Sequence, residues 1–124
     1  MAVKSVILKV GFAKVKEAQN QLNEELKKIE GFIGYKVVTN GHHSSVVIFY
    51  DTEPSGETII PQVKIVEYST TDTEEAKKSI DEELKDINPI SLDVVTPIDG
   101  NRLVILYDAT PTDSIDVSKI NSDD

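Results

Sequence analysis

One apolar stretch of this chain occurs twice, and that recurrence constrains the fold more than any other feature. Residues 46–51 read VVIFYD and residues 103–108 read LVILYD. Each stretch follows a Val-Val-Thr triplet, at residues 37–39 and 94–96. Farther upstream, Glu-Glu-Leu-Lys also occurs twice, at residues 24–27 and 82–85. The chain is therefore expected to contain one structural unit in two copies.

Hydrophobic periodicity gives both halves the element order strand, helix, strand, strand. Helices are predicted where apolar side chains recur every three or four positions, within residues 13–30 and after Asp72, a residue suited to cap a helix N-terminus. Gly31 is expected to stop the first helix. The predicted strands are residues 3–10, 35–39 and 46–50 in the first half and residues 62–68, 92–96 and 103–108 in the second.

The expected fold class is α+β, with tandem duplicated βαββ units. The last strand of each unit is its most uniformly apolar one, so it should lie between the other two. Units joined edge to edge would give a mainly antiparallel six-stranded sheet with two helices on one face. The expected boundaries are a first βαββ repeat at 1–52, a linker at 53–61, a second repeat at 62–109 and an acidic, largely disordered tail at 110–124.

Two helices on one face would leave the other sheet face apolar and uncovered. The side chains expected there are Val47, Phe49, Val104 and Leu106. Because a large apolar face rarely stays in water, either the two halves pack sheet against sheet or one chain pairs with another through this face. We predict a homo-oligomer in which these four residues form the interface.

Composition narrows the function further. Hydrophobic residues make up 39% of the 124 residues, which is typical of globular proteins, and no apolar run approaches the roughly 20 residues that span a membrane. The N-terminal residues do not form a signal peptide pattern, so a cytoplasmic protein without membrane contact is expected. The absence of cysteine removes thiolate chemistry, and the net charge of −9 disfavours direct binding to nucleic acid.

Polar residues at the strand ends are the candidate ligand-binding site. Tyr50 and Tyr107 each precede an aspartate, and a related pair of such groups could bind a symmetric ligand. The structural interpretation is that each tyrosine closes the core with its hydroxyl in water, while each aspartate ends a strand. The candidate ligand-binding residues are Tyr50, Tyr107, Asn101, Arg102, Ser44 and Ser45.

No residue pattern indicates catalysis, a metal site or a cofactor. The neighbouring His42 and His43 are the only histidines, and no compact set of further ligands accompanies them. Glycine-rich phosphate loops and a Ser/His/Asp constellation are missing from the sequence. We therefore expect a protein that is not an enzyme.

The second half resembles a family of very short proteins, known as sporulation proteins, from spore-forming bacteria and their phages. The shared pattern runs from the Val-Lys strand at residues 62–67, through a helix with Glu83 and Leu84, to Leu-Asp-Val at residues 92–94 and a strand that ends in Tyr107. The resemblance implies a small βαββ accessory protein of a bacterium or phage that assembles and binds something. It assigns no functional residue.

We therefore expect a non-enzymatic binding or assembly protein that acts as an oligomer, in the cytoplasm of a bacterium or of a phage's host. One alternative is a phage anti-defence protein that sequesters a small signalling nucleotide between subunits. Another is an acidic decoy that binds a basic, nucleic-acid-binding protein partner. The acidic side chains that suggest the decoy are Asp72, Glu74, Glu75, Asp81, Glu82, Glu83 and Asp86.

Overall fold

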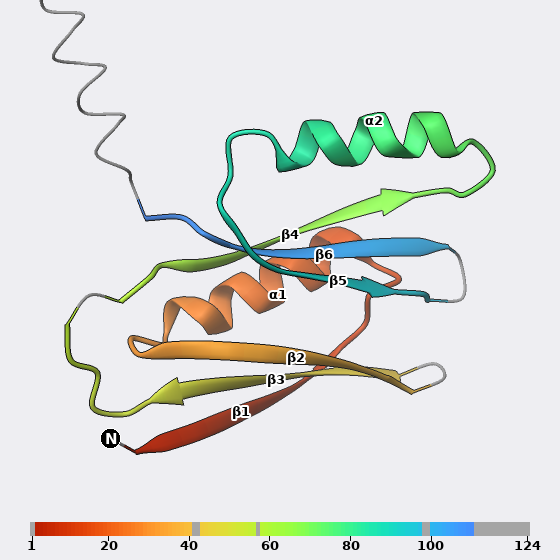
Figure 1. Cartoon of the computed structure of the whole chain (residues 1–124). Coiled ribbons are helices and arrows are strands. Elements are labelled where there is room, and N and C mark those ends of the chain that lie inside the picture. The colour runs from red at the N-terminus through yellow and green to blue at the C-terminus, as the bar shows by residue number, and fades with distance from the viewer. Residues whose placement is uncertain (1, 41–42, 57, 98–99, 111–124) are drawn as a thin grey trace, which may run out of the picture.

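The computed structural model describes residues 2–40, 43–56, 58–97 and 100–110. Within these ranges the elements follow the order expected from the sequence (Figure 1). The first unit consists of β1 (Val3–Val10), α1 (Val15–Lys27), β2 (Phe32–Asn40) and β3 (His43–Asp51). The second unit consists of β4 (Pro61–Tyr68), α2 (Thr73–Leu84), β5 (Pro89–Val95) and β6 (Asn101–Asp108). The expected tail, apart from Thr110, lies outside the described residues.

The strands form two three-stranded antiparallel sheets, which we name sheet A, with order β1-β3-β2, and sheet B, with order β4-β6-β5. The last strand of each unit is central, as predicted. The expected six-stranded sheet is replaced by two separate sheets, because side chains of α1, instead of a strand, bond to the outer edge of β4. The expectation that both helices share one face is also corrected, since sheet B lies between α1 and α2 (Figure 1).

The larger core joins both units around α1. Three side chains of α1, Ala18, Leu22 and Leu26, are fully buried in it, as the helical spacing predicted. Sheet A contributes the side chains that face α1, and sheet B contributes the face remote from α2. The strand residues of this core are Val10, Tyr35, Val46, Ile48, Val63, Ile65, Val95, Val104 and Leu106.

A smaller core lies between sheet B and α2. Ile80 and Leu84 of α2 pack against Val66, Leu103 and Ile105 of the sheet. No residue of α2 is fully buried, in contrast with α1. The difference arises because α1 packs against side chains of both sheets, whereas α2 packs against one face of sheet B (Figure 1).

Two local predictions have opposite outcomes. Asp72 caps α2 as predicted, because its carboxylate accepts a hydrogen bond from the backbone N–H of Glu75 at 3.1 Å. The expected role of Gly31 is wrong, since α1 ends at Lys27. Gly31 instead lies against the end of β3, where a Cβ atom would collide with the carbonyl oxygen of Asp51. Its own carbonyl accepts a hydrogen bond from Asp51 N at 2.7 Å.

Candidate functional site

The outer face of sheet A is apolar, and no described element covers it. The register places Ile7 opposite Val47, and Ser5 opposite Phe49, with their side chains directed away from α1. Ile7 is 70% exposed, which is unusual for a large apolar residue in the middle of a strand. We name this surface the open face. Its apolar residues are Val3, Ile7, Val38, Val47 and Phe49.

Two lysines border the open face. Lys36 on β2 pairs with Val47, and Lys9 on β1 pairs with Ser45, so both lysines lie on the same side of the sheet as Phe49. Their positive charges contrast with the net charge of −9 of the whole chain. The open face can therefore bind an apolar surface that carries acidic groups at its rim.

The corresponding face of sheet B is buried inside the chain. Val104 and Leu106, which stand where Val47 and Phe49 stand in the first unit, are 0% and 1% exposed. They pack in the core around α1, so they are not available to another molecule. The predicted interface is therefore wrong for Val104 and Leu106, and for Val47 and Phe49 it stays a prediction.

Two amide side chains of α1 bind the outer edge of β4. Asn23 Oδ1 accepts from Val63 N at 2.7 Å, and Asn23 Nδ2 donates to Val63 O at 3.1 Å. Gln19 Oε1 accepts from Ile65 N at 2.9 Å. Asn23 follows Gln19 by one helical turn, and alternate residues of a strand present their backbone groups to the same edge. The sequence reasoning missed this pair, although its signal is visible as two amides directly beside the apolar stripe.

Arg102 has a structural position. Its side chain is buried, and it donates from Nε to Phe12 O at 3.2 Å and from Nη2 to Ala13 O at 3.4 Å. Glu67 Oε1 lies 3.5 Å from the same Nη2 atom. These bonds tie β6 to the turn before α1, so the guanidinium expected to contact a ligand is used within the fold.

The other predicted ligand contacts do not form one site. Tyr107 belongs to the core under α2, where its hydroxyl donates to Gln62 Oε1 at 2.9 Å, whereas Tyr50 lies at the end of β3 in sheet A. Ser44 and Ser45 are half-buried at the start of β3, opposite β1. Asn101 lines a different cleft, at the start of β6, together with Arg102.

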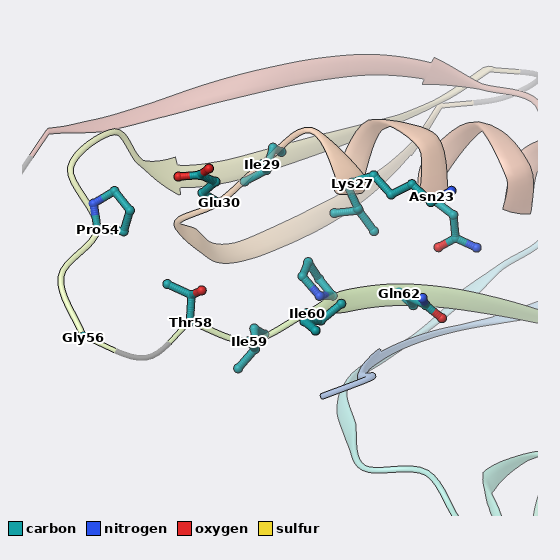
Figure 2. A pocket seen from close by; sticks show the side chains of 12 residues that line it. Asn23, Lys27, Ile29, Glu30, Pro54, Gly56, Thr58, Ile59, Ile60 and Gln62 are labelled. Atoms are coloured by element: carbon teal, nitrogen blue, oxygen red, sulfur yellow. The ribbon is translucent and has the colours of Figure 1, made fainter. Parts of the chain in front are cut away.

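A cleft of about 550 Å³ lies between the C-terminal end of α1, the segment before β4 and β4 itself (Figure 2). In Figure 2, Lys27 runs along α1 toward Asn23, Asn23 points toward the strand that carries Gln62, and Glu30 lies across from Pro54. The cleft mixes apolar and polar surface, and Nζ of Lys27, the lysine among its described lining residues, is 3.7 Å from Glu24 Oε1. Its other lining residues are Leu26, Ile29, Gly56, Thr58, Ile59, Ile60, Pro61 and Gln62.

Comparison with protein-family models, with curated proteins and with solved structures finds no match.

A buried tyrosine lies where the two sheets meet. The Tyr35 hydroxyl on β2 and the Ser91 hydroxyl on β5 are both buried without a hydrogen-bond partner. Burial raises the pKa of Tyr35, and the charge of Asp93 raises it further, while the neighbouring Ser91 has a smaller, opposite effect. The phenol is therefore neutral at any physiological pH and suits packing, not proton transfer.

Asp51 and Asp108 close equivalent turns after the central strands. Asp51 Oδ1 accepts from Glu53 N, and Asp108 Oδ1 accepts from Thr110 N, both at 2.9 Å. Asp108 Oδ1 also accepts from Ile60 N at 3.3 Å. Desolvation alone would raise the pKa of Asp108, but the hydrogen bonds from Thr110 and Ile60 lower it overall. These aspartates end the strands, as the structural interpretation of the sequence holds.

The acidic helix α2 contains an exposed ion pair. On α2, Asp81 is 2.6 Å from Lys77, and the hydrogen bond with Asp81 raises the pKa of that lysine.

Among the described residues no three His, Cys, Asp or Glu side chains form a group that could hold a metal ion. The His42-His43 pair lies outside the residues whose side chains are described. No described helix has the length and hydropathy needed to cross a membrane.

Proposed function

We propose that this chain is a non-enzymatic binding and assembly protein, built by tandem duplication of a βαββ unit, that acts as a homo-oligomer. The open face of sheet A carries the proposal. An exposed apolar surface of this kind, bordered by polar residues, is typical of protein interaction sites. The equivalent face of the second unit is completely covered by the first unit, which supports the same use for the open face.

Sedimentation velocity over a concentration series tests the proposal. The unmodified chain should sediment as an oligomer, and Phe49→Asp should reduce it to a monomer because a carboxylate would be buried in the interface. Ile60→Asp is the matched control, since Ile60 is also exposed but lies at the linker cleft. A chain that remains monomeric up to millimolar concentration would refute self-assembly.

A second candidate function is ligand binding in the linker cleft. Its volume of about 550 Å³ lies within the range of roughly 300–1,000 Å³ that is common for small-molecule pockets. A small signalling nucleotide is the ligand that we propose, with Lys27 as a phosphate contact. Cyclic and adenine nucleotides should then raise the melting temperature, and Lys27→Ala should abolish the increase. Unchanged melting at saturating nucleotide would exclude this function.

A further inference from the structure

Among the described residues, two apolar surfaces stand out as uncovered, and each one is equivalent to a surface that is buried in the other unit. The first is the open face. Its residue Ile7 is the fifth residue of β1 and corresponds to Ile65, the buried fifth residue of β4. The second lies beside α2 on β5, where Leu92 and Val94 are 51% and 56% exposed. We name the open face the tail surface, and we name α2 with Leu92 and Val94 the head surface.

The head surface corresponds to the part of the first unit that holds sheet B. Leu92 and Val94 are the fourth and sixth residues of β5, and Tyr35 and Val37 have the same places in β2. Tyr35 is buried and Val37 partly buried in the core that they share with sheet B. The apolar stripe of α2 likewise repeats that of α1 but stays only half-buried. The chain thus contains one completed junction and the two unpaired halves of a second.

Among the described residues, no side chain bonds the outer edge of β1 at Ser5 and Ile7, the part needed for a second junction; farther along this edge, Gln21 Nε2 donates to the Lys9 carbonyl at 2.9 Å. Thr52 N donates to Ala2 O at 2.9 Å, which shows that Ala2 directs its carbonyl toward β3. Because successive residues of a strand alternate, the N–H and C=O groups of Ser5 and Ile7 point away from β3. These are the third and fifth residues of β1, the positions at which β4 offers Val63 and Ile65 to α1.

Polar groups on α2 fit that edge. Lys77 and Asp81 are the fifth and ninth residues of α2, the places that Gln19 and Asn23 occupy in α1. A carboxylate can accept from the Ser5 N–H, and an ammonium can donate to the Ile7 carbonyl. The present contact between Lys77 and Asp81 is exposed, so redirecting it costs little.

Each junction pairs a positive with a negative side chain, but the helix and the strand exchange signs between the two junctions. Lys16 of α1 and Glu67 of β4 line one cleft at the completed junction. At the same positions α2 has Glu74, the second residue of the helix, and β1 has Lys9, the seventh residue of the strand. A second junction would again bring opposite charges together. A symmetric dimer through two open faces would instead gather Lys9 and Lys36 of both copies in one interface, which is unfavourable.

We infer that copies of this chain associate head to tail, with the open face of one copy packed against α2 and β5 of the next. The inference rests on the proposed self-assembly and adds its geometry. Such a contact joins two different surfaces, so it produces a closed ring or an open filament instead of a simple twofold dimer.

Two blocked variants test the geometry. Ile7→Asp blocks the tail surface, and the double substitution Leu92→Asp with Val94→Asp blocks the head surface. All three residues are exposed, so both variants should retain the fold, which circular dichroism and thermal melting would verify. In sedimentation velocity each variant alone should be monomeric, whereas an equimolar mixture should form a dimer through the one intact head and the one intact tail.

Other outcomes would show whether the head-to-tail geometry or self-assembly itself is wrong. If the tail-blocked variant is monomeric while the head-blocked variant assembles like the unmodified chain, the open face pairs with itself and the head-to-tail geometry is wrong, although self-assembly stands. If both variants assemble normally, neither surface is the interface. An unmodified chain that never assembles would refute the proposed function together with this geometry.

A charge reversal gives an independent measurement that does not depend on apolar burial. Lys9→Glu should weaken association by about two- to fivefold, as expected for an exposed ion pair. Adding Glu74→Lys to the same chain should restore the affinity, because each junction would again contain opposite charges. A double variant that binds more weakly than Lys9→Glu would contradict the predicted proximity of Lys9 and Glu74.

Discussion

Asn23 satisfies both backbone groups of Val63 with a single side chain, accepting from the N–H at 2.7 Å and donating to the carbonyl at 3.1 Å. This contact, 40 residues apart in sequence, substitutes for a neighbouring strand at the edge of β4. An edge strand without a partner exposes a row of unpaired groups that promotes association with other chains. The contact therefore fixes the second unit against α1 and protects that edge.

Replacing Asn23 should destabilise the chain measurably. Asn23→Ala leaves the partly buried N–H and C=O of Val63 without partners, so the free energy of unfolding should fall by about 1–3 kcal/mol. Urea denaturation measures the change. Asn20→Ala is the matched control, because Asn20 is on the same helix and is exposed. Equal stabilities of the two variants would show that the bonds to Val63 contribute nothing.

Arg102 should be important through its bonds to the backbone more than through its ion pair. Arg102→Met leaves Phe12 O and Ala13 O without their donor and should cost about 2–3 kcal/mol of unfolding free energy. Glu67→Gln should cost less than about 1 kcal/mol, since Glu67 is well exposed. Chemical denaturation of both variants would test this order, and the reverse order would assign the stability to the ion pair.

The two tyrosines of the cores should respond oppositely to loss of the hydroxyl. Tyr35→Phe removes a buried oxygen that has no partner, so stability should stay unchanged or rise by about 1 kcal/mol. Tyr107→Phe loses the bond to Gln62 and should lower stability by about 0.5–1.5 kcal/mol. Thermal melting of the pair provides the comparison. A clear loss of stability in Tyr35→Phe would mean that its hydroxyl is bonded in solution.

Asp108 should make stability depend on pH in the acidic range. Its folded pKa is lowered below the ordinary value of 3.8, so its contribution is complete above that value and is lost as pH falls through the folded pKa. Asp108→Asn can still accept hydrogen bonds but does not titrate there. We would measure the melting temperatures of both chains from about pH 5 to about pH 2. The two curves should converge as pH falls, and parallel curves would contradict the assignment.

Local features of the fold were predictable because their causes lie close together in the sequence. The apolar spacing of Leu22 and Leu26 and the cap at Asp72 depend on neighbours within one or two turns. The central position of β3 and β6 followed from their continuous apolar character. The order of elements and the α+β class were predictable from the same local patterns, and the structure confirms both.

The division into two sheets depends on a choice between distant surfaces, and the sequence reasoning did not resolve it. Packing of the two halves and pairing of two chains would each have covered the apolar face of Val104 and Leu106. The deciding residues, Gln19 and Asn23, look like ordinary polar positions of a helix until β4 is placed beside them. Arg102 was taken for a ligand contact, although alternation puts it on the same side of β6 as Val104, the side that packs in the core around α1.

The position of α1 also has a consequence for how the chain folds. Because α1 contributes to the core of both units, the first unit lacks part of its native packing until β4 and β6 have been made. The ribosome must therefore complete most of the chain before the helix can find its full set of partners. We expect the chain to unfold in one cooperative transition in which neither unit persists alone, as is usual for small proteins with a shared core.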